Sequence, residues 1–503
     1  MRKSFALLLA LVILVSGTGI YTQAALLREK DQVHFTESFS YGDKSVVEGA
    51  QVEMYNYYNN KIFWHTIYEF GEEIKEKTDY EFYPWYHERE SSFPGSLETM
   101  MDYMSFGTGA VMEDKEYSGL NAAMKELYDK TPNGEKNQMI IHLKDYADYY
   151  TFGLNFRFPN QVGNLYKGYD GIMLLYPEQL DEDIAEYEEN GADSEHLNML
   201  RKVRKDWDNF NEFFKIPVIE KEIYGLSLSK DEKGRITGMG TSNVGGGSTT
   251  GDIDSPDIFN IEGLDGFTLW FEALYDNGDC FLTFDPHTHN GNLVDTSQIP
   301  GGFGIYHFTY DNQNGTIDSE NIQMVYELNP EHNICSLKIE ASGENLLLVT
   351  DENNRTYLSV INRDTMSLVQ KLDMGDAEDY FYFDSYKDYM VTRSDELAVY
   401  TKDAAGLYQK EFGVEIAEME RKLGVKENEG YVNWSGIHDW NGETLLIVSN
   451  RYSECAFFLT AVDETGLLYY GEYKSSLITG DEEYYSCYPE HNKENAVLVH
   501  WGK

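Results

Sequence analysis

GENLLLVTDENNRTYLSVINRD, residues 343–364, contains a strand pattern that recurs through the second half of the chain. Its run Leu346–Val349 is apolar at four consecutive positions, whereas a strand with one face in water alternates apolar and polar residues. Consecutive apolar residues therefore indicate a sheet that is covered on both faces. A polar turn precedes this run, and a further apolar strand, Tyr357–Ile361, follows it. The segment predicts two adjacent strands in the middle of a buried sheet.

The same order of strands and turns returns along the chain after residue 258. A first strand and a tight polar turn precede each apolar second strand, and a third strand, a hairpin turn and a fourth strand follow it. Turns of the form Asp-x-x-Gly, at 403–406 and 463–466, supply a type I turn that ends in a glycine able to adopt positive φ. The second strands are separated by 65, 43, 56 and 51 residues and begin at Phe281, Leu346, Tyr389, Leu445 and Ala496.

On this strand order and spacing, residues 260–503 resemble the β-propeller superfamily, in which four-stranded blades stack radially and cover both faces of each sheet. The resemblance lies in the repeat pattern alone, because Asp439-Trp440 reverses the dipeptide of WD repeats. It implies a mainly β fold, a β-propeller of about seven four-stranded blades, with six or eight as alternatives. Helical insertions are expected in the N-terminal half, at Ala122–Tyr128, Glu178–Glu189 and Glu195–Phe214.

Four segments follow from these patterns: an N-terminal signal or anchor at 1–27, a β-rich half at 28–243, a Gly/Ser/Thr-rich linker at 244–257 and propeller blades at 258–503. Residues Ala496–Trp501 read as the second strand of a last blade. We expect the strand-like Val33–Ser40 to complete that blade and so to close a ring. Two separate β domains, N-terminal and C-terminal, are the alternative.

The first 27 residues have the layout of an export signal. Arg2 and Lys3 precede the apolar run Phe5–Val15, and small residues stand before a cleavage position after Ala24. An uncleaved N-terminal anchor is the alternative, because the apolar character extends to Leu27. Both readings predict an extracytoplasmic protein that is secreted or anchored in the membrane at the cell surface.

Composition limits the partners. The chain has 503 residues, 40 Lys+Arg and 87 Asp+Glu, and thus a formal net charge of −47. This charge argues against nucleic acid, whose phosphates require a basic surface. We expect a protein or cell-envelope ligand instead, and the 39 tyrosines suit either a binding face or ordinary strands. The four cysteines are read as buried apolar residues, with two disulfides as the alternative: Cys280, Cys335, Cys455 and Cys487.

Two clusters could bind a metal ion. Asp285, His287 and His289 place two imidazoles and a carboxylate within five residues, although a polar loop after an apolar strand has the same composition. A second cluster, Asp252, Asp254 and Asp257, offers hard oxygen ligands for calcium, although turns rich in Asp look alike. No other cofactor is expected.

Catalytic residues cannot be assigned, because the sequence lacks the common nucleophile, zinc-protease and P-loop motifs. The basic cluster 201–205 is read as a solvated helix face or as a set of partners for acidic residues on the same helix pair. The leading hypothesis is an exported, non-enzymatic binding or scaffold protein of the cell envelope. Alternatives are an extracellular carbohydrate-active enzyme with acidic residues in a central channel, and a structural subunit of a membrane complex.

Overall fold

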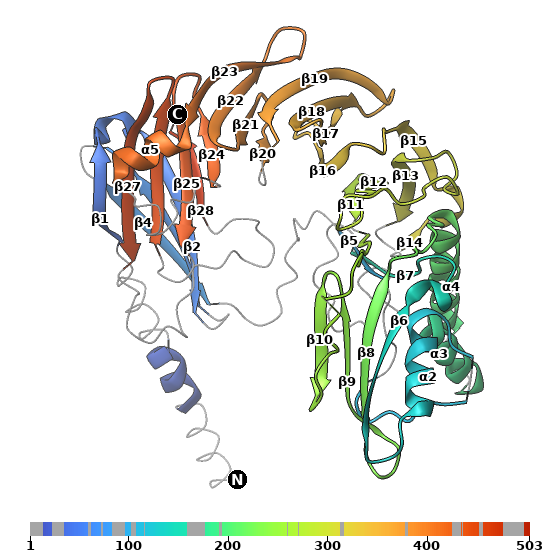
Figure 1. The fold of residues 1–503 in the computed structure, drawn as a ribbon. Helices are drawn as coiled ribbons and strands as arrows, with labels where there is room; N and C mark the ends of the chain where they lie inside the picture. Colours follow the sequence, from blue (N-terminus) through green and yellow to red (C-terminus); the bar gives the residue numbers. More distant parts are fainter. Residues whose placement is uncertain are drawn as a thin grey trace, which may run out of the picture. The chain divides into compact units, whose positions relative to one another are not determined.

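The computed structural model shows a mainly β chain whose sheets are antiparallel (Figure 1). The described residues form one two-stranded sheet, four four-stranded sheets and two five-stranded sheets. The chain divides into two compact units, unit 1 (Met1–Ser92 with Glu378–Lys503) and unit 2 (Phe93–Ala377). The structure describes residues 14–22, 35–58, 62–71, 74–82, 96–101, 107–114, 116–157, 177–190, 194–258, 260–269, 271–311, 316–377, 381–424, 434, 436–451, 456–475 and 497–502.

Two sheets that follow one another along the chain make up one part of unit 2. The first contains β11 (Phe271–Asp276), β12 (Asp279–Phe284), β13 (Gly304–Asp311), β14 (Thr316–Ile317) and β15 (Gln323–Glu327), with the short helix η3 (Ser319–Asn321) between the last two. The second runs in the order β16 (Asn333–Ile339), β17 (Asn345–Glu352), β18 (Arg355–Asn362) and β19 (Ser367–Asp376).

The quoted sequence segment forms β17 and β18. Leu346–Val349 are at most 1% exposed, which confirms that this sheet is covered on both faces. Asn353 and Asn354 connect the two strands with φ of 52° and 63°. Positive φ at both central residues matches the right-handed twist of a hairpin, and asparagine tolerates it better than most residues.

The other part of unit 2 combines a sheet with helices. Its strands lie in the order β10 (Gly246–Gly251), β9 (Ile236–Asn243), β8 (Ile223–Lys230) and β6 (Lys136–His142). Leu226 and Leu228 share one buried core with Leu120 and Met124 of the first helix. The three predicted helices are confirmed as α2 (Gly119–Lys130), α3 (Pro177–Asn190) and α4 (Ser194–Phe213). Unit 2 also contains η2 (Leu143–Asp145) and a strand pair, β5 (Ser96–Met101) with β7 (Phe152–Arg157).

The linker predicted at 244–257 is wrong. Residues Gly246–Gly251 form β10, which pairs with β9 from Gly246↔Asn243 to Gly251↔Gly238. A Gly/Ser/Thr tract has the composition of a flexible connector, but here an adjacent strand supplies partners for its backbone groups. The division between the units also falls elsewhere, at residues 92–93 and 377–378.

Unit 1 contains three sheets. The first has the strand order β20 (Tyr382–Ser385), β21 (Tyr389–Arg393), β22 (Glu396–Lys402) and β23 (Tyr408–Glu415). The second has the order β24 (Ile437–Trp440), β25 (Leu445–Arg451), β26 (Ala456–Asp463), β27 (Gly466–Ser475) and β1 (Phe35–Gly42). The third has the order β28 (Val497–Trp501), β2 (Ala50–Tyr58), β3 (Ile62–Glu69) and β4 (Lys75–Phe82). Helix α5 (Ile416–Leu423) follows β23, and η1 (Lys44–Val47) lies between β1 and β2.

Strands from the two ends of the chain share sheets in unit 1, with a pairing that differs from the prediction. Strand β1 pairs with β27 and not with the last strand, while β2 pairs with β28 from Ala50↔Trp501 to Met54↔Val497. Strand β28 is therefore the edge strand of its sheet and not a second strand. The short helix η1 connects β1 in one sheet to β2 in the next.

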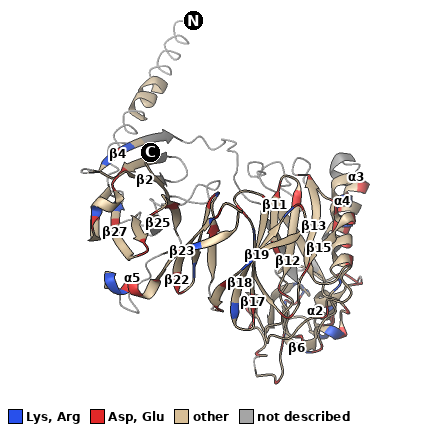
Figure 2. Cartoon of the chain, turned by 90° about the horizontal axis from the view of Figure 1, so that it is seen from above, with Lys and Arg blue, Asp and Glu red and all other residues tan. Residues whose placement is uncertain are grey.

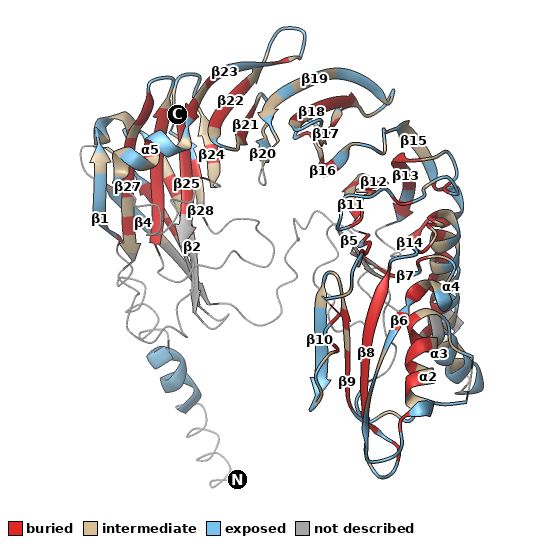
Figure 3. Ribbon diagram, viewed as in Figure 1, coloured by how far each residue is buried: buried red, intermediate tan, exposed pale blue. Residues whose placement is uncertain are grey.

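Buried residues concentrate in the inner strands of the sheets, and exposed ones in edge strands such as β1, β10 and β19 (Figure 3). Acidic positions are spread over the elements of both units (Figure 2). Cys280 is buried as predicted, whereas Cys335 is exposed, against the prediction; Cys455 and Cys487 lie outside the described residues.

Residues 14–22 of the N-terminal segment are helical, and the rest of 1–27 lies outside the described residues. Among the helices that the structure describes, none combines the length and apolar character needed to cross a membrane.

Candidate functional site

The histidine cluster after β12 is only partly assembled. His287 Nδ1 lies 2.6 Å from Asp285 Oδ1, while His289 Nε2 lies 3.2 Å from the hydroxyl of Thr268. The structure thus brings Asp285 and His287 together and gives His289 a different neighbour. Within the described ranges, no three His, Cys, Asp or Glu side chains are arranged to hold a metal ion. A metal at this cluster stays a prediction.

A buried carboxylate organises the loop that carries these histidines. Asp265, 3% exposed, accepts hydrogen bonds from Thr288 Oγ1 at 2.8 Å and Asn292 Nδ2 at 2.9 Å, and from the backbone N–H groups of Gly266 and Asn290. Burial acts to raise the pKa of Asp265, but these hydrogen bonds outweigh it and hold the pKa below its usual value. Asp265 is therefore a fixed anion that shapes the loop.

A second buried carboxylate, that of Glu222, belongs to a residue bridged to Asp265. Glu222, 1% exposed, accepts hydrogen bonds from the Tyr150 hydroxyl at 2.9 Å and from the backbone N–H of Phe267 at 3.0 Å. Sequence analysis missed both carboxylates, because each is a single acidic residue whose partners lie far away in the chain. The only local signal is Gly263-Leu-Asp-Gly-Phe267, an acid between glycines beside apolar residues.

The three aspartates predicted to bind calcium do not share neighbours. Asp252 pairs with Lys136 Nζ at 3.2 Å, and Asp257 accepts from Asn260 Nδ2 at 3.1 Å. All three are exposed, whereas Pro256 and Ile258 in the same segment are buried. Calcium binding here also stays a prediction.

A groove of about 300 Å³ lies between α4 and the β13–β14 hairpin in unit 2. Its lining combines two lysines, three carboxylates, hydroxyl groups and one aliphatic side chain: Lys202, Lys205, Thr309, Tyr310, Asp311, Thr316, Ile317, Asp318 and Glu320. Lys202 Nζ pairs with Asp206 and donates to the carbonyl of Ile317 at 2.8 Å, and Lys205 pairs with Glu320. The lysines are thus held in place at the edge of the groove.

Asp206 lies behind this groove with its side chain fully buried. Its Oδ1 accepts from Ser319 Oγ at 2.6 Å, and its Oδ2 makes no hydrogen bond with the residues that the structure describes. Burial raises the pKa of this carboxyl, against the opposing effect of Lys202. The site therefore joins a buried carboxyl to a polar groove through one lysine.

The basic cluster 201–205 supplies these lysines, and its other members pair with acidic residues of the same helix pair. Arg201 lies 2.6 Å from Glu188 and Arg204 lies 3.0 Å from Asp181 on α3. The alternative reading of 201–205, as partners for acidic residues on the same helix pair, holds for the two arginines, while Arg201 and Lys205 are also exposed to solvent as the first reading expected. What the sequence did not indicate is the contact of Lys202 and Lys205 with residues 317 and 320.

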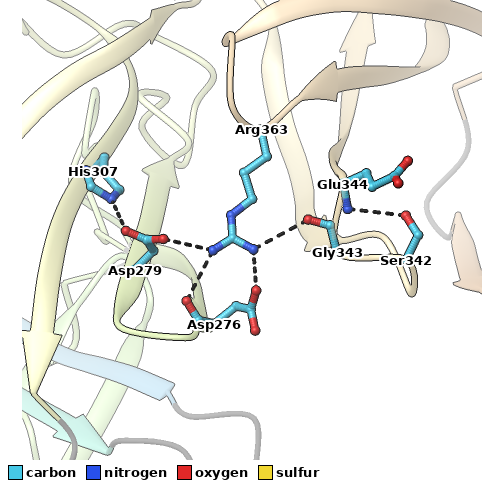
Figure 4. Close-up of polar contacts among 7 residues, drawn as sticks. All are labelled: Asp276, Asp279, His307, Ser342, Gly343, Glu344 and Arg363. Carbon is cyan, nitrogen blue, oxygen red and sulfur yellow. Dashed lines mark hydrogen bonds and ion pairs between the residues drawn. The ribbon is translucent and has the colours of Figure 1, made fainter.

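An arginine connects the two consecutive sheets of unit 2 (Figure 4). Arg363, in the turn after β18, pairs through Nη1 with the carboxylate of Asp276, and its Nη2 donates to Asp279 Oδ2 at 2.9 Å. His307 Nε2 lies 2.8 Å from the other oxygen of Asp279. With its side chain only 13% exposed, Arg363 satisfies carboxylates that would otherwise repel each other at the β11–β12 turn. This cluster is structural.

A buried histidine lies between two sheets of unit 1. The hydroxyl of Tyr386 lies 3.1 Å from His438 Nδ1, and Tyr389 donates to the carbonyl of His438 at 3.2 Å. Burial lowers the pKa of His438 to about 4, against the attraction of Asp384 and the backbone of Trp434; Arg393 lowers it further. The folded chain therefore holds this imidazole neutral at pH values where an exposed histidine is charged.

Acid should weaken unit 1 through this histidine. Because the folded-state pKa lies below the ordinary value of 6.5, the unfolded chain takes up a proton first. The contribution of His438 is complete above pH 6.5 and is lost as the pH falls towards 4, by at most roughly 3 kcal/mol. His438→Gln removes this pH-dependent contribution. The free energy of unfolding that the variant loses relative to wild type, measured in urea, should therefore be smaller at pH 4.5 than at pH 7.5. The exposed His500→Gln is the control, and a deficit independent of pH would contradict the prediction.

Comparisons with known proteins give no family. No protein-family profile matches the chain, and no curated protein matches it. Similar solved structures include a eukaryotic initiation factor, with 11% identity and TM-score 0.23, covering 51% of this chain and 55% of the other. The Dos1 propeller has 13% identity and TM-score 0.23, with 50% and 55% covered. A putative 6-phosphogluconolactonase from Bacteroides uniformis has 10% identity and TM-score 0.24, with 50% and 66% covered.

The matched region thus spans little more than half of the first two structures. Similarity at these TM-scores transfers neither fold nor activity. The description of this chain as propeller-like rests on its own consecutive four- and five-stranded antiparallel sheets with covered inner strands.

Proposed function

We propose that the chain is an exported, extracytoplasmic, propeller-like protein that binds a protein or cell-envelope ligand without catalysing a reaction. The basic and apolar residues at its N-terminus support export. The groove beside α4 carries the binding part of the proposal. It offers donors, acceptors and charges of both signs in fixed positions, which suit a polar ligand.

A carbohydrate-active extracellular enzyme is the second candidate, and one observation favours it. The carboxyl of Asp206 has a raised pKa close to the groove, which is the property required of a general acid in glycoside hydrolysis. In the binding proposal the same carboxyl only positions Lys202. Turnover of a polysaccharide by the full chain, lost in Asp206→Asn, would replace the binding proposal with this one.

Export is tested first. Residues 1–30, fused to a reporter that is active only outside the cytoplasm, should give reporter activity. Leu9→Arg places a charge in the apolar run and should abolish it. Equal activity of both fusions, or activity of neither, contradicts export. N-terminal sequencing of the exported chain then separates cleavage after Ala24 from an uncleaved anchor.

A further inference from the structure

The two walls of the groove beside α4 are fixed to each other. Helix α4 lies beside β14 (Figure 1), and Lys202 of the helix donates to the carbonyl of Ile317 in that strand at 2.8 Å. Ser319 of η3 is buried; its Oγ donates to Asp206 Oδ1 at 2.6 Å and accepts from Asn209 Nδ2 at 3.1 Å, both on α4. The groove is therefore formed before any ligand arrives, which lowers the entropic cost of binding.

The groove carries more negative than positive charge. Two lysines and three carboxylates line it, and the carboxyl of Asp206 lies behind it. Each lysine is already paired with a carboxylate. The two lining carboxylates outside these pairs belong to Asp311 and Asp318, and Asp318 accepts hydrogen bonds from the neutral amide of Asn321 at 2.8 and 3.0 Å. An anionic ligand would thus be repelled here and a cationic one attracted.

Four side chains that can accept hydrogen bonds share one face of the β13–β14 hairpin. Asp311 lies opposite Thr316 in the register, and the backbone N–H of Asp318 donates to the carbonyl of Thr309. Residues opposite each other, or two apart in one strand, have their side chains on the same face. The hydroxyls of Thr309 and Thr316 make no hydrogen bond to the part of the chain that the structure describes. Two carboxylates and two available hydroxyls therefore lie together in the lining of the groove.

An ammonium group suits this set of acceptors. It donates three hydrogen bonds and accepts none, so one carboxylate and two hydroxyls can satisfy it. The chain itself shows this chemistry at the edge of the groove, where the ammonium of Lys202 lies on the carboxylate of Asp206 and on the carbonyl of Ile317. Acceptors are in excess there too, because Asp206 Oδ2 makes no hydrogen bond within the described ranges. The volume of about 300 Å³ accommodates a long, unbranched side chain.

We propose that the groove beside α4 binds a primary ammonium group at the end of an aliphatic stem, as a lysine side chain of a partner protein presents it. This inference rests on the proposed binding function and gives the class of ligand. The ammonium lies against Asp311 and Asp318, and Thr309 and Thr316 accept its remaining hydrogens. The net charge of −47 on the chain attracts a basic partner before contact is made.

The test measures binding of Nα-acetyl-lysine N-methylamide to the full chain by NMR titration at about 0.15 M salt, which screens long-range attraction. The double variant Asp311→Asn/Asp318→Asn should bind this probe at least about tenfold more weakly, because it loses charge-assisted hydrogen bonds. Asp252→Asn/Asp254→Asn is the matched control. It removes the same charge from exposed positions of unit 2 that do not line the groove, and should change the affinity by less than about twofold.

A second probe keeps the test decisive if the Asp318 substitution disturbs the hairpin. The same compound with its ε-amine acetylated keeps the stem but loses the charge and two of the three donors, so wild type should bind it at least about tenfold more weakly. Failure of the lysine probe to bind, or equal weakening by the two double variants, overturns the proposal. Tighter binding of 1,5-diaminopentane than of the lysine probe overturns the assignment to a partner protein.

The proposed binding function and this inference can fail separately. Equal binding of the lysine probe and its acetylated form would overturn the ammonium as the ligand, but the groove would still be a binding site for a neutral polar group. Export is measured by the reporter fused to residues 1–30 and does not depend on either probe.

Discussion

A chain that ends after Glu494 is expected to lose the cooperative unfolding of unit 1. The truncation removes β28, which pairs with β2 over five residues and contributes the buried Val499 to a core shared with β25, β26 and β27. It also removes the backbone N–H of Trp501, which donates to Asp439 Oδ2 at 2.6 Å. Strand β2 is then an open edge with unpaired backbone groups, a site of aggregation. We expect a loss of more than about 5 kcal/mol, which equals the whole stability of the less stable domains.

Two point variants in β28 separate this effect from the mere shortening of the chain. Val499 is 1% exposed, whereas the next residue, His500, points to solvent. Val499→Asp buries a charge without a partner and should cost at least about 3 kcal/mol, while His500→Asp should cost less than about 0.5 kcal/mol. Urea unfolding measures both. Full stability of the truncated chain, or equal effects of the two variants, would show that β28 does not hold unit 1 together.

Arg363→Ala should lower the free energy of unfolding of unit 2 by about 3 kcal/mol. The arginine is the one cation shown between Asp276 and Asp279 in Figure 4, and its removal leaves two carboxylates close together at the edge of a buried sheet. Breaking a buried ion pair by removing one partner costs about 3–5 kcal/mol, and the residual exposure of this pair places the value at the lower end.

Arg355→Ala is the matched control, because it removes an arginine from the other end of β18. Arg355 also pairs with two aspartates, Asp373 and Asp376, but its side chain is 42% exposed. Exposed pairs contribute about 0–1 kcal/mol. Thermal and urea unfolding of the full chain should therefore separate the two variants clearly. An Arg363→Ala chain as stable as Arg355→Ala would mean that solvent screens the cluster.

The contrast between the groove and the histidine cluster explains why the candidate sites were hard to predict. Asp285, His287 and His289 are close in sequence, but a loop gives successive side chains different neighbours, so His289 contacts Thr268 instead. The groove joins α4 to a hairpin more than 100 residues later, through Lys202 and the carbonyl of Ile317. Proximity in sequence was a poor guide to proximity in space at both sites.

The sequence alone determined where the central strands and the helices lie. Leu346–Val349 and Leu445–Val448 are buried strands because consecutive apolar residues need cover on both faces, whatever the neighbouring sheet. The helix predicted at Glu195–Phe214 is likewise present, as α4 (Ser194–Phe213). These features depend on interactions between residues a few positions apart, and the amino-acid order records them directly.

Only the tertiary structure decided which strands pair across the chain and which side chains meet. Backbone hydrogen bonds can form between any two strands, so the sequence of β28 does not show whether it pairs with β1 or with β2. In the structure it pairs with β2, and its Val499 packs into a shared core. The sequence indicated that Arg363 lies in a turn, but it did not indicate the partner Asp276, which lies 87 positions earlier. The tract 244–257 has the composition of a linker, yet Gly246–Gly251 form β10 because β9 lies beside them and supplies partners for their backbone groups.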